Sequence, residues 1–362
     1  MATPLPSAER FDMLDAWRGL AAAAVVLHHT SSFQHGHEAV ILFFVISGYC
    51  IAGSMEACLA KGMGLRAFAW RRVRRIYPPY FLAVAFFVLT RWLRAALGGS
   101  PPQWPLHVWA QNLTLTQWLS LLQHPKAFAA DNPTLFVAAF WSLCYEEQFY
   151  LVMAVVMLLP AMRSRVGVLV ALMAVGLAWV VLAPRLCFGP FLEYWPELGI
   201  GCLLFYRLCR WRSGAVRRLF DVVLVALMAL GAWAHFALDE RSGAQRPAFG
   251  ELLLASAFAL VLVATRPLND LFLRSRLGRG LMALGVISYS LYLVHQFNVH
   301  AIRAVAGWLL PSGTPAAISS AVQLALHVGL GALFWHVCER PFTNRSLAPT
   351  SRPPGPRDEV VA

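Results

Sequence analysis

The sequence consists of apolar segments of about 20 residues separated by short basic clusters, and such a segment is as long as a helix needs to cross a bilayer. Hydrophobic residues make up 59% of the chain and charged residues 13%, whereas a soluble globular protein has roughly 25% charged residues. The sequence therefore predicts an all-α integral membrane protein, a bundle of about ten transmembrane helices. The predicted spans are 12–31, 39–58, 76–96, 140–159, 167–184, 189–209, 219–237, 249–266, 281–300 and 317–338.

The basic clusters predict the orientation of this bundle. The chain carries a net charge of +12, and most of its Lys and Arg residues fall in alternate loops, which the positive-inside rule places in the cytoplasm. Both termini are then cytoplasmic. A basic protein can also bind nucleic acid, but clusters between apolar spans do not favour a nucleic-acid partner. We expect contacts with membrane lipids instead, and a multi-pass protein of a bacterial inner membrane.

The remaining segments and the cysteines complete the prediction of domains and metal sites. Residues 101–135 are aromatic but interrupted by polar residues, which favours an interfacial or re-entrant segment over a full span. Residues 1–342 are predicted to form one membrane domain, and the Pro-rich residues 343–362 a disordered cytoplasmic tail. The seven cysteines lack metal-ligand spacing, so no metal site is expected.

The first span carries ionisable residues into the membrane. Charges at that depth are costly, so they are functional candidates. Arg18 and His29 lie eleven residues apart, nearly three helical turns, so they share one helix face about 16 Å apart. Asp15, three residues before Arg18, is close enough to pair with it. We expect a site that extends from one membrane surface into the opposite half, with His28 as an alternative base to His29.

Polar residues in two other spans fall at a depth similar to that of His29. Glu146 lies in the outer half of span 140–159, and Ser288, Tyr292 and His295 form a stripe on span 281–300. A carboxylate beside a neutral imidazole can orient it for proton abstraction, so Glu146 is predicted to orient His29. The alternative is that these groups only hydrogen-bond between helices.

A second group of candidates lies near the predicted inner surface. Arginine clusters bind phosphate groups bidentately. The sequence therefore predicts a binding site for a cytosolic polyphosphate at Arg18, Arg72, Arg75 and Arg340. A charge cluster that only sets topology is the alternative. Gly48 favours close helix packing, although approach by a ligand chain is also possible.

As a set, these residues resemble the membrane acyltransferase 3 family, over residues 12–342. The motifs that carry the resemblance occur in the family's order, and any one alone would be weak. They are Arg18 with His29 eleven residues later, Phe43-Phe44-x-x-Ser47-Gly48, Arg72-x-x-Arg75-Ile76-x-Pro78, Trp141-Ser142-Leu143-x-x-Glu146-x-x-Phe149-Tyr150, Ser288-Tyr289-x-x-Tyr292-Leu293-x-His295 and Glu339-Arg340-Pro341.

The resemblance implies an O-acyltransferase that moves an acyl group, usually acetyl, from a cytosolic acyl-CoA to a hydroxyl of an extracytoplasmic glycan or glycolipid. Acetyl-CoA would be a co-substrate and a surface polysaccharide or other carbohydrate the acceptor. His29 would be catalytic, Arg18 its partner in the donor channel, Arg72 and Arg75 contacts for the CoA phosphates, and Ser47 a contact along the pantetheine path. The sequence leaves open the acceptor, the acyl length, the oligomeric state and an acyl-histidine relay.

A transporter or flippase of a small polar or lipid-linked molecule is the alternative function, since buried charges also mark transport pathways. No internal repeat and no corresponding pair of broken helices is visible in the sequence, and both are common in transporters. A purely structural role is a third hypothesis.

Overall fold

The computed structural model describes residues 11–122, 134–182, 191–237 and 246–343, and every regular element in these ranges is helical. Short 3₁₀ turns and one π-helical turn (Trp335–Glu339) complete or connect the α-helices. The α-helices are α1 (Met13–Thr30), α2 (Gly36–Ala60), α3 (Leu65–Ala96), α4 (Leu106–Thr114), α5 (Trp141–Met157), α6 (Met162–Leu182), α7 (Trp195–Cys209), α8 (Gly214–Ala237), α9 (Arg246–Thr265), α10 (Asn269–Arg274), α11 (Arg276–Val286), α12 (Ser288–Leu309) and α13 (Ala316–Phe334).

Six helical segments in the described ranges are long and apolar enough to cross a membrane, or seven if α11 and α12 count as one bent span. The six contain α2, α3, α6, α8, α9 and α13. The protein is therefore a multi-pass membrane protein. Among the other predicted spans, α1 carries Asp15 and Arg18, and α5 and α7 have only 17 and 15 residues. The count of ten and the orientation of the termini stay predictions.

Two predicted boundaries are wrong. The arginine cluster at 71–75 was expected in a loop before a span starting at 76, but α3 already begins at Leu65 and the cluster is helical. The predicted span 281–300 is not one straight helix, because α11 and α12 meet at an angle of 67°. A bend at Ile287 starts a new helix at Ser288, so the stripe of Ser288, Tyr292 and His295 lies entirely on α12.

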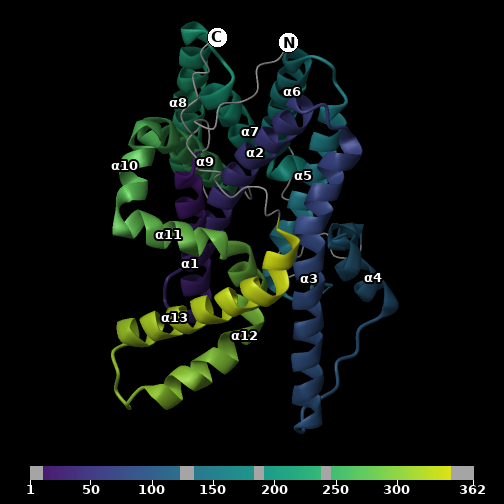
Figure 1. The fold of residues 1–362 in the computed structure, drawn as a ribbon, viewed down its shortest axis with the longest axis vertical. Helices are drawn as coiled ribbons and strands as arrows, with labels where there is room; N and C mark the ends of the chain where they lie inside the picture. The colour runs from purple at the N-terminus through teal and green to yellow at the C-terminus, as the bar shows by residue number, and fades with distance from the viewer. Residues whose placement is uncertain (1–10, 123–133, 183–190, 238–245, 344–362) are drawn as a thin grey trace, which may run out of the picture.

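The core of the bundle lies around α2, which runs through the middle of the molecule (Figure 1). Of the apolar segment of α2, 61% is buried inside the protein, whereas only 22% of the apolar segments of α8 and of α13 is buried. Helix α2 is therefore central, and α8 and α13 are peripheral. A Cβ on Gly48 would collide with the Leu198 carbonyl of α7, and one on Gly201 with the Val45 carbonyl of α2. Gly48 therefore permits close helix packing, the favoured interpretation.

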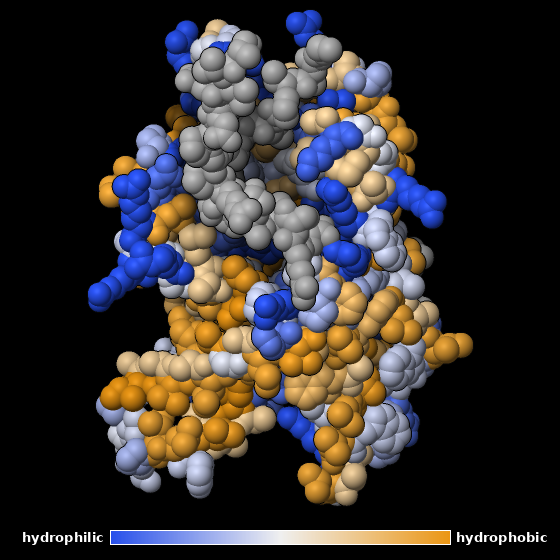
Figure 2. All heavy atoms as spheres, in the orientation of Figure 1, coloured by the Kyte–Doolittle hydropathy of each residue, from blue (hydrophilic) through white to orange (hydrophobic). Residues whose placement is uncertain are grey.

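Large apolar side chains face outward from the peripheral helices. Trp233 and Phe236 on α8, Trp308 on α12 and Leu333 on α13 are all more than 60% exposed. Figure 2 shows hydrophobic side chains gathered over α12, α13 and the lower part of α3, with hydrophilic ones more frequent towards the other end. In water such a surface would be an aggregation risk, whereas in a bilayer it is the surface that contacts lipid.

The stretch 101–135 contains no full span in its described part. It holds the nine-residue helix α4 and a 3₁₀ turn at Gln117–Leu122, in line with an interfacial or re-entrant segment. Residues 123–133 of this stretch lie outside the described residues. Residues 344–362 also lie outside the described residues, so the disordered tail predicted for residues 343–362 stays a prediction.

Candidate active site

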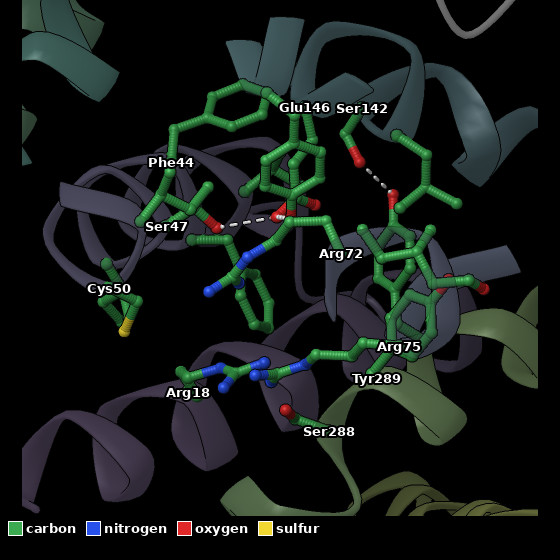
Figure 3. A pocket seen from close by; sticks show the side chains of 18 residues that line it. Arg18, Phe44, Ser47, Cys50, Arg72, Arg75, Ser142, Glu146, Ser288 and Tyr289 are labelled. Atoms are coloured by element: carbon green, nitrogen blue, oxygen red, sulfur yellow. Dashed lines mark hydrogen bonds between the residues drawn. The ribbon is translucent and has the colours of Figure 1, made fainter. Parts of the chain in front are cut away.

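A cavity of about 810 Å³ lies between α1, α2, α3, α5 and α12, and three arginines line it (Figure 3). We call it the arginine cavity. Arg18 reaches it from α1, and Arg72 and Arg75 from α3. Because Arg72 and Arg75 are three residues apart on a helix, they project from the same face. Figure 3 shows the guanidinium groups of Arg18 and Arg75 directed toward one another.

Two polar atoms in the residues that line the arginine cavity have no hydrogen-bond partner in the described part of the chain. They are Arg72 Nε and Ser288 Oγ, and both are buried. The Arg72 guanidinium also lies over the rings of Phe68 and Tyr150, 5.9 and 5.8 Å from their centroids. Buried polar groups are normally satisfied, and each exception needs an explanation. A ligand with oxygen acceptors, such as a phosphate ester, would supply the missing partner.

Of the other residues predicted to bind or support the acyl-CoA donor, some lie at the arginine cavity and some do not. Arg18 Nη1 lies 3.8 Å from Asp15 Oδ1, the pairing predicted from their spacing. Glu339 is buried and accepts hydrogen bonds from the backbone N–H and hydroxyl of Ser290, at 3.2 and 2.6 Å. Arg340 is not among the lining residues; it is exposed and contacts His336 and Trp335. Its predicted place in the donor site is not what the structure shows.

Glu146 belongs to the arginine cavity. Its Oε1 accepts hydrogen bonds from the Ser47 hydroxyl at 3.2 Å and from the Tyr150 hydroxyl at 2.5 Å. Ser47 also lines this cavity, as the predicted ligand contact would require. The expectation that Glu146 orients His29 is wrong in this geometry, because the two residues face different cavities. The predicted topology gives the two residues a similar depth, but the rotation of α5 about its axis directs Glu146 toward the arginines.

His29 lines a second cavity, of about 520 Å³, together with His28 and His37. We call it the histidine cavity. The His29 ring has its centroid 4.9 Å from that of His28 and 5.1 Å from that of His295. The His28 Nδ1 is bonded to the Phe33 carbonyl at 3.2 Å, so one of its two nitrogens is already engaged. His29 makes no hydrogen bond with any described residue, which makes it the better candidate base of the adjacent pair.

The two cavities adjoin at Val40 and Tyr292, which line both of them. The Tyr292 hydroxyl is fixed in place, because it donates to the Ala139 carbonyl and accepts from the Ser142 hydroxyl at 2.7 Å. Arg18 and His29, at opposite ends of one face of α1, therefore open onto two spaces that meet at a shared wall. The two cavities share this wall, and a continuous path from the arginines to the imidazole stays a prediction.

Sequence reasoning missed a histidine–carboxylate pair in the histidine cavity. His37 Nε2 lies 2.6 Å from Glu251 Oε1, although the two residues are 214 positions apart. The His37 ring stacks on Trp141, with centroids 5.7 Å apart and planes at 16°. This accounts for Trp141, whose role the motif alone left open. A lone histidine at the start of an apolar span gave no signal of such a partner.

The described residues contain no group of three or more His, Cys, Asp and Glu side chains arranged to hold a metal ion. The side chains that line the two cavities include guanidinium groups, hydroxyls and imidazoles. These groups bind anions and transfer protons.

Comparison with known proteins decides the family. Residues 11–334 match the family described as an acyltransferase domain. The chain belongs to this family. The matched residues include those that line both cavities and the shared wall.

Curated acyltransferases align over most of the chain at low identity. A putative membrane-bound transacylase, BcsY, of Komagataeibacter xylinus is 27% identical over 90% of this chain and 81% of its own length. A putative peptidoglycan O-acetyltransferase, YrhL, of Bacillus subtilis is 25% identical over 94% of this chain and 56% of its own. The O-acetyltransferase OatA of Staphylococcus aureus is 26% identical over 78% and 49%. The chain thus spans about half the length of the latter two relatives. No solved structure matches the chain.

Proposed function

We propose that this protein is a membrane O-acyltransferase that moves an acetyl group from cytosolic acetyl-CoA to a hydroxyl of an extracytoplasmic glycan or glycolipid. The observation that carries the proposal is the pair of adjoining cavities, one lined by arginines and one by histidines, with Val40 and Tyr292 common to both. Family membership and the names of two relatives as O-acetyltransferases support it.

The arginine cavity suits the donor. CoA carries phosphate groups, and guanidinium groups bind phosphate through paired, charge-assisted hydrogen bonds. Arg72 brings a buried nitrogen without a partner, and Arg18 and Arg75 converge on the same space. The apolar wall formed by Phe43, Phe44 and Ile51 suits the rest of the donor. We place this cavity toward the cytosol, because acyl-CoA is made there.

The histidine cavity suits the acceptor and the chemistry. In the proposed reaction, a bare nitrogen of His29 takes the proton of the acceptor hydroxyl, and the hydroxyl oxygen attacks the thioester carbonyl carbon. The carbon–sulfur bond breaks, and the CoA thiolate takes the proton from His29. Atoms and charges balance to an ester and free CoA. General-base help of this kind contributes typically about 10²–10⁴ in rate, and positioning contributes much of the rest.

The test uses purified full-length protein in liposomes and radiolabelled acetyl-CoA, with no ion gradient present. We expect transfer to added host surface polysaccharide, and its loss in His29→Ala with acetyl-CoA binding retained. Mass spectrometry of the polysaccharide from cells with and without the protein would identify the acceptor and the acylated position. Normal transfer by a well-expressed His29→Ala protein would refute the proposal, and movement of a solute without acetyl transfer would favour a transporter.

A further inference from the structure

Next to His29, the buried imidazole of His295 has one nitrogen without a hydrogen-bond partner. His295 is 0% exposed, and its Nδ1 lies 2.8 Å from the Tyr292 carbonyl oxygen. A carbonyl oxygen can only accept, so Nδ1 carries a hydrogen. In the neutral ring Nε2 is then a bare acceptor. Nε2 is buried, and no described residue donates to it.

Moving the hydrogen from Nδ1 to Nε2 would set the bare Nδ1 against the Tyr292 carbonyl oxygen, so that two acceptors face one another. Adding a second hydrogen at Nε2 is also costly. A doubly protonated His295 would bury a positive charge and leave an N–H without an acceptor, and burying such a group is strongly unfavourable. His327, which packs behind, does not change this, because its Nε2 approaches the His295 backbone carbonyl at 3.3 Å rather than the ring. The neutral form with Nδ1 protonated is the one that the surroundings of His295 support.

His29 is the ionisable ring that packs beside His295. The two rings have centroids 5.1 Å apart and planes at 39°. Two imidazoles joined by one N–H···N hydrogen bond have a centroid separation of about this size. No such bond is formed between the two rings here, and catalytic hydrogen bonds often tighten only when substrate is bound. The other ring beside His29 belongs to His28, which is engaged with the Phe33 carbonyl.

We propose that His295 is the positioning residue for His29: its bare Nε2 accepts the N–H of the His29 ring and thereby holds the opposite His29 nitrogen unprotonated toward the acceptor hydroxyl. This deepens the proposed function and rests on it. An imidazole takes the part that a carboxylate plays in Ser-His-Asp sites, where loss of the orienting partner leaves the wrong tautomer. It also replaces Glu146, the orienting group expected from the sequence.

Two variants of similar size separate the two nitrogens of His295. In His295→Gln the amide can place an acceptor near the position of Nε2, whereas in His295→Asn it can only reach the Tyr292 carbonyl, as Nδ1 does. We expect kcat for transfer to stay within about tenfold of wild type in the Gln variant and to fall by about 10²-fold or more in the Asn variant. The KM for acetyl-CoA should change in neither, since the donor lies in the other cavity.

The controls are His300→Gln and His300→Asn, exposed substitutions on the same helix that should transfer at the wild-type rate. Equal losses in the two His295 variants, a larger loss in Gln than in Asn, or wild-type activity in Asn would overturn the inference. A structural role for Nδ1 predicts the reverse order. If His29→Ala retains transfer, the proposed function itself fails; if it is inactive while the two His295 variants behave alike, only the positioning role fails.

A measurement on the wild-type protein needs no variant to fold. In protein with ¹⁵N-labelled histidine, solid-state NMR reports which ring nitrogen carries the hydrogen. We expect His295 to be protonated at Nδ1 alone and His29 to be in a single tautomer once acetyl-CoA or CoA is bound. A His295 ring protonated at Nε2, or an equal mixture of His29 tautomers in the CoA complex, would contradict the inference.

Discussion

Replacing Arg72 by Met tests the donor site most sharply, because no described acidic side chain forms an ion pair with this arginine. Arg72 makes no ion pair within the described residues, whereas Arg165 is bound to Glu56 at 2.9 Å. Its guanidinium is held by two aromatic rings, and its Nε is buried without a partner. Its positive charge is therefore available to a ligand. Met retains the apolar stem and removes only the charged group.

The size of the effect follows from one lost charge-assisted contact. Hydrogen bonds to charged groups contribute about 1.5–3 kcal/mol, and each 1.4 kcal/mol corresponds to about a tenfold change in affinity. We expect Arg72→Met to raise the Kd of CoA by about 10- to 150-fold. Arg72→Lys should lie between Met and wild type, because Lys keeps the charge but loses the planar pair of donors.

The assay is equilibrium binding of radiolabelled CoA to detergent-purified protein, together with the KM for acetyl-CoA. Arg71→Met is the matched control, since the neighbouring Arg71 contacts Cys58 and Met63 and lies outside the arginine cavity. Its Kd should equal that of wild type. Unchanged CoA affinity in Arg72→Met, or the same loss in both variants, would refute the assignment of the donor site.

Three further predictions follow from the geometry. Glu146→Gln should reduce transfer far less than His29→Ala and should change the KM for acetyl-CoA, because Glu146 lies in the arginine cavity; an equally inactive Glu146→Gln with normal KM would contradict this. Gly48→Ala should lower the thermal midpoint, at a cost of about 1–3 kcal/mol from overpacking, whereas Gly167→Ala, where a Cβ meets open space, should not. Glu56→Ala should cost about 3–5 kcal/mol because it leaves the buried guanidinium of Arg165 without its ion-pair partner, and a normal melting midpoint would contradict this.

The relation between Arg18 and His29 could be predicted because it depends only on the period of a helix. Eleven residues fix their shared face whatever surrounds α1. The same local reasoning gave the pairing of Asp15 with Arg18, and the stripe on α12. The arginine and histidine sites could therefore be placed at opposite ends of one helix before any tertiary contact was known.

The partners across helices could not be predicted in the same way. Glu146 and His29 share a depth in the expected topology, but depth does not specify how far each helix is rotated about its axis. The packing of α5 directs Glu146 to Ser47 and Tyr150. The pairing of His37 with Glu251 depends on α9 lying against α2, a contact with no periodic signal in either segment.

The start of helix α3 was predicted wrongly for a different reason. A cluster of arginines is hydrophilic, so hydropathy places it in a loop, yet arginine is a good helix former. In α3 the helix continues through residues 71–75, and Pro78 and Pro79 lie inside it. The helical setting matters for the site, because it directs Arg72 and Arg75 from one face into the same cavity.

The most direct test of a continuous path between the two cavities is a Trp substitution at Val40, which lines both. The account predicts that Val40→Trp binds CoA with wild-type affinity but transfers acetyl groups at less than about a hundredth of the wild-type rate, while the smaller Val40→Ala keeps transferring. Wild-type transfer by Val40→Trp would mean that the acetyl group does not pass this wall, and would contradict the account.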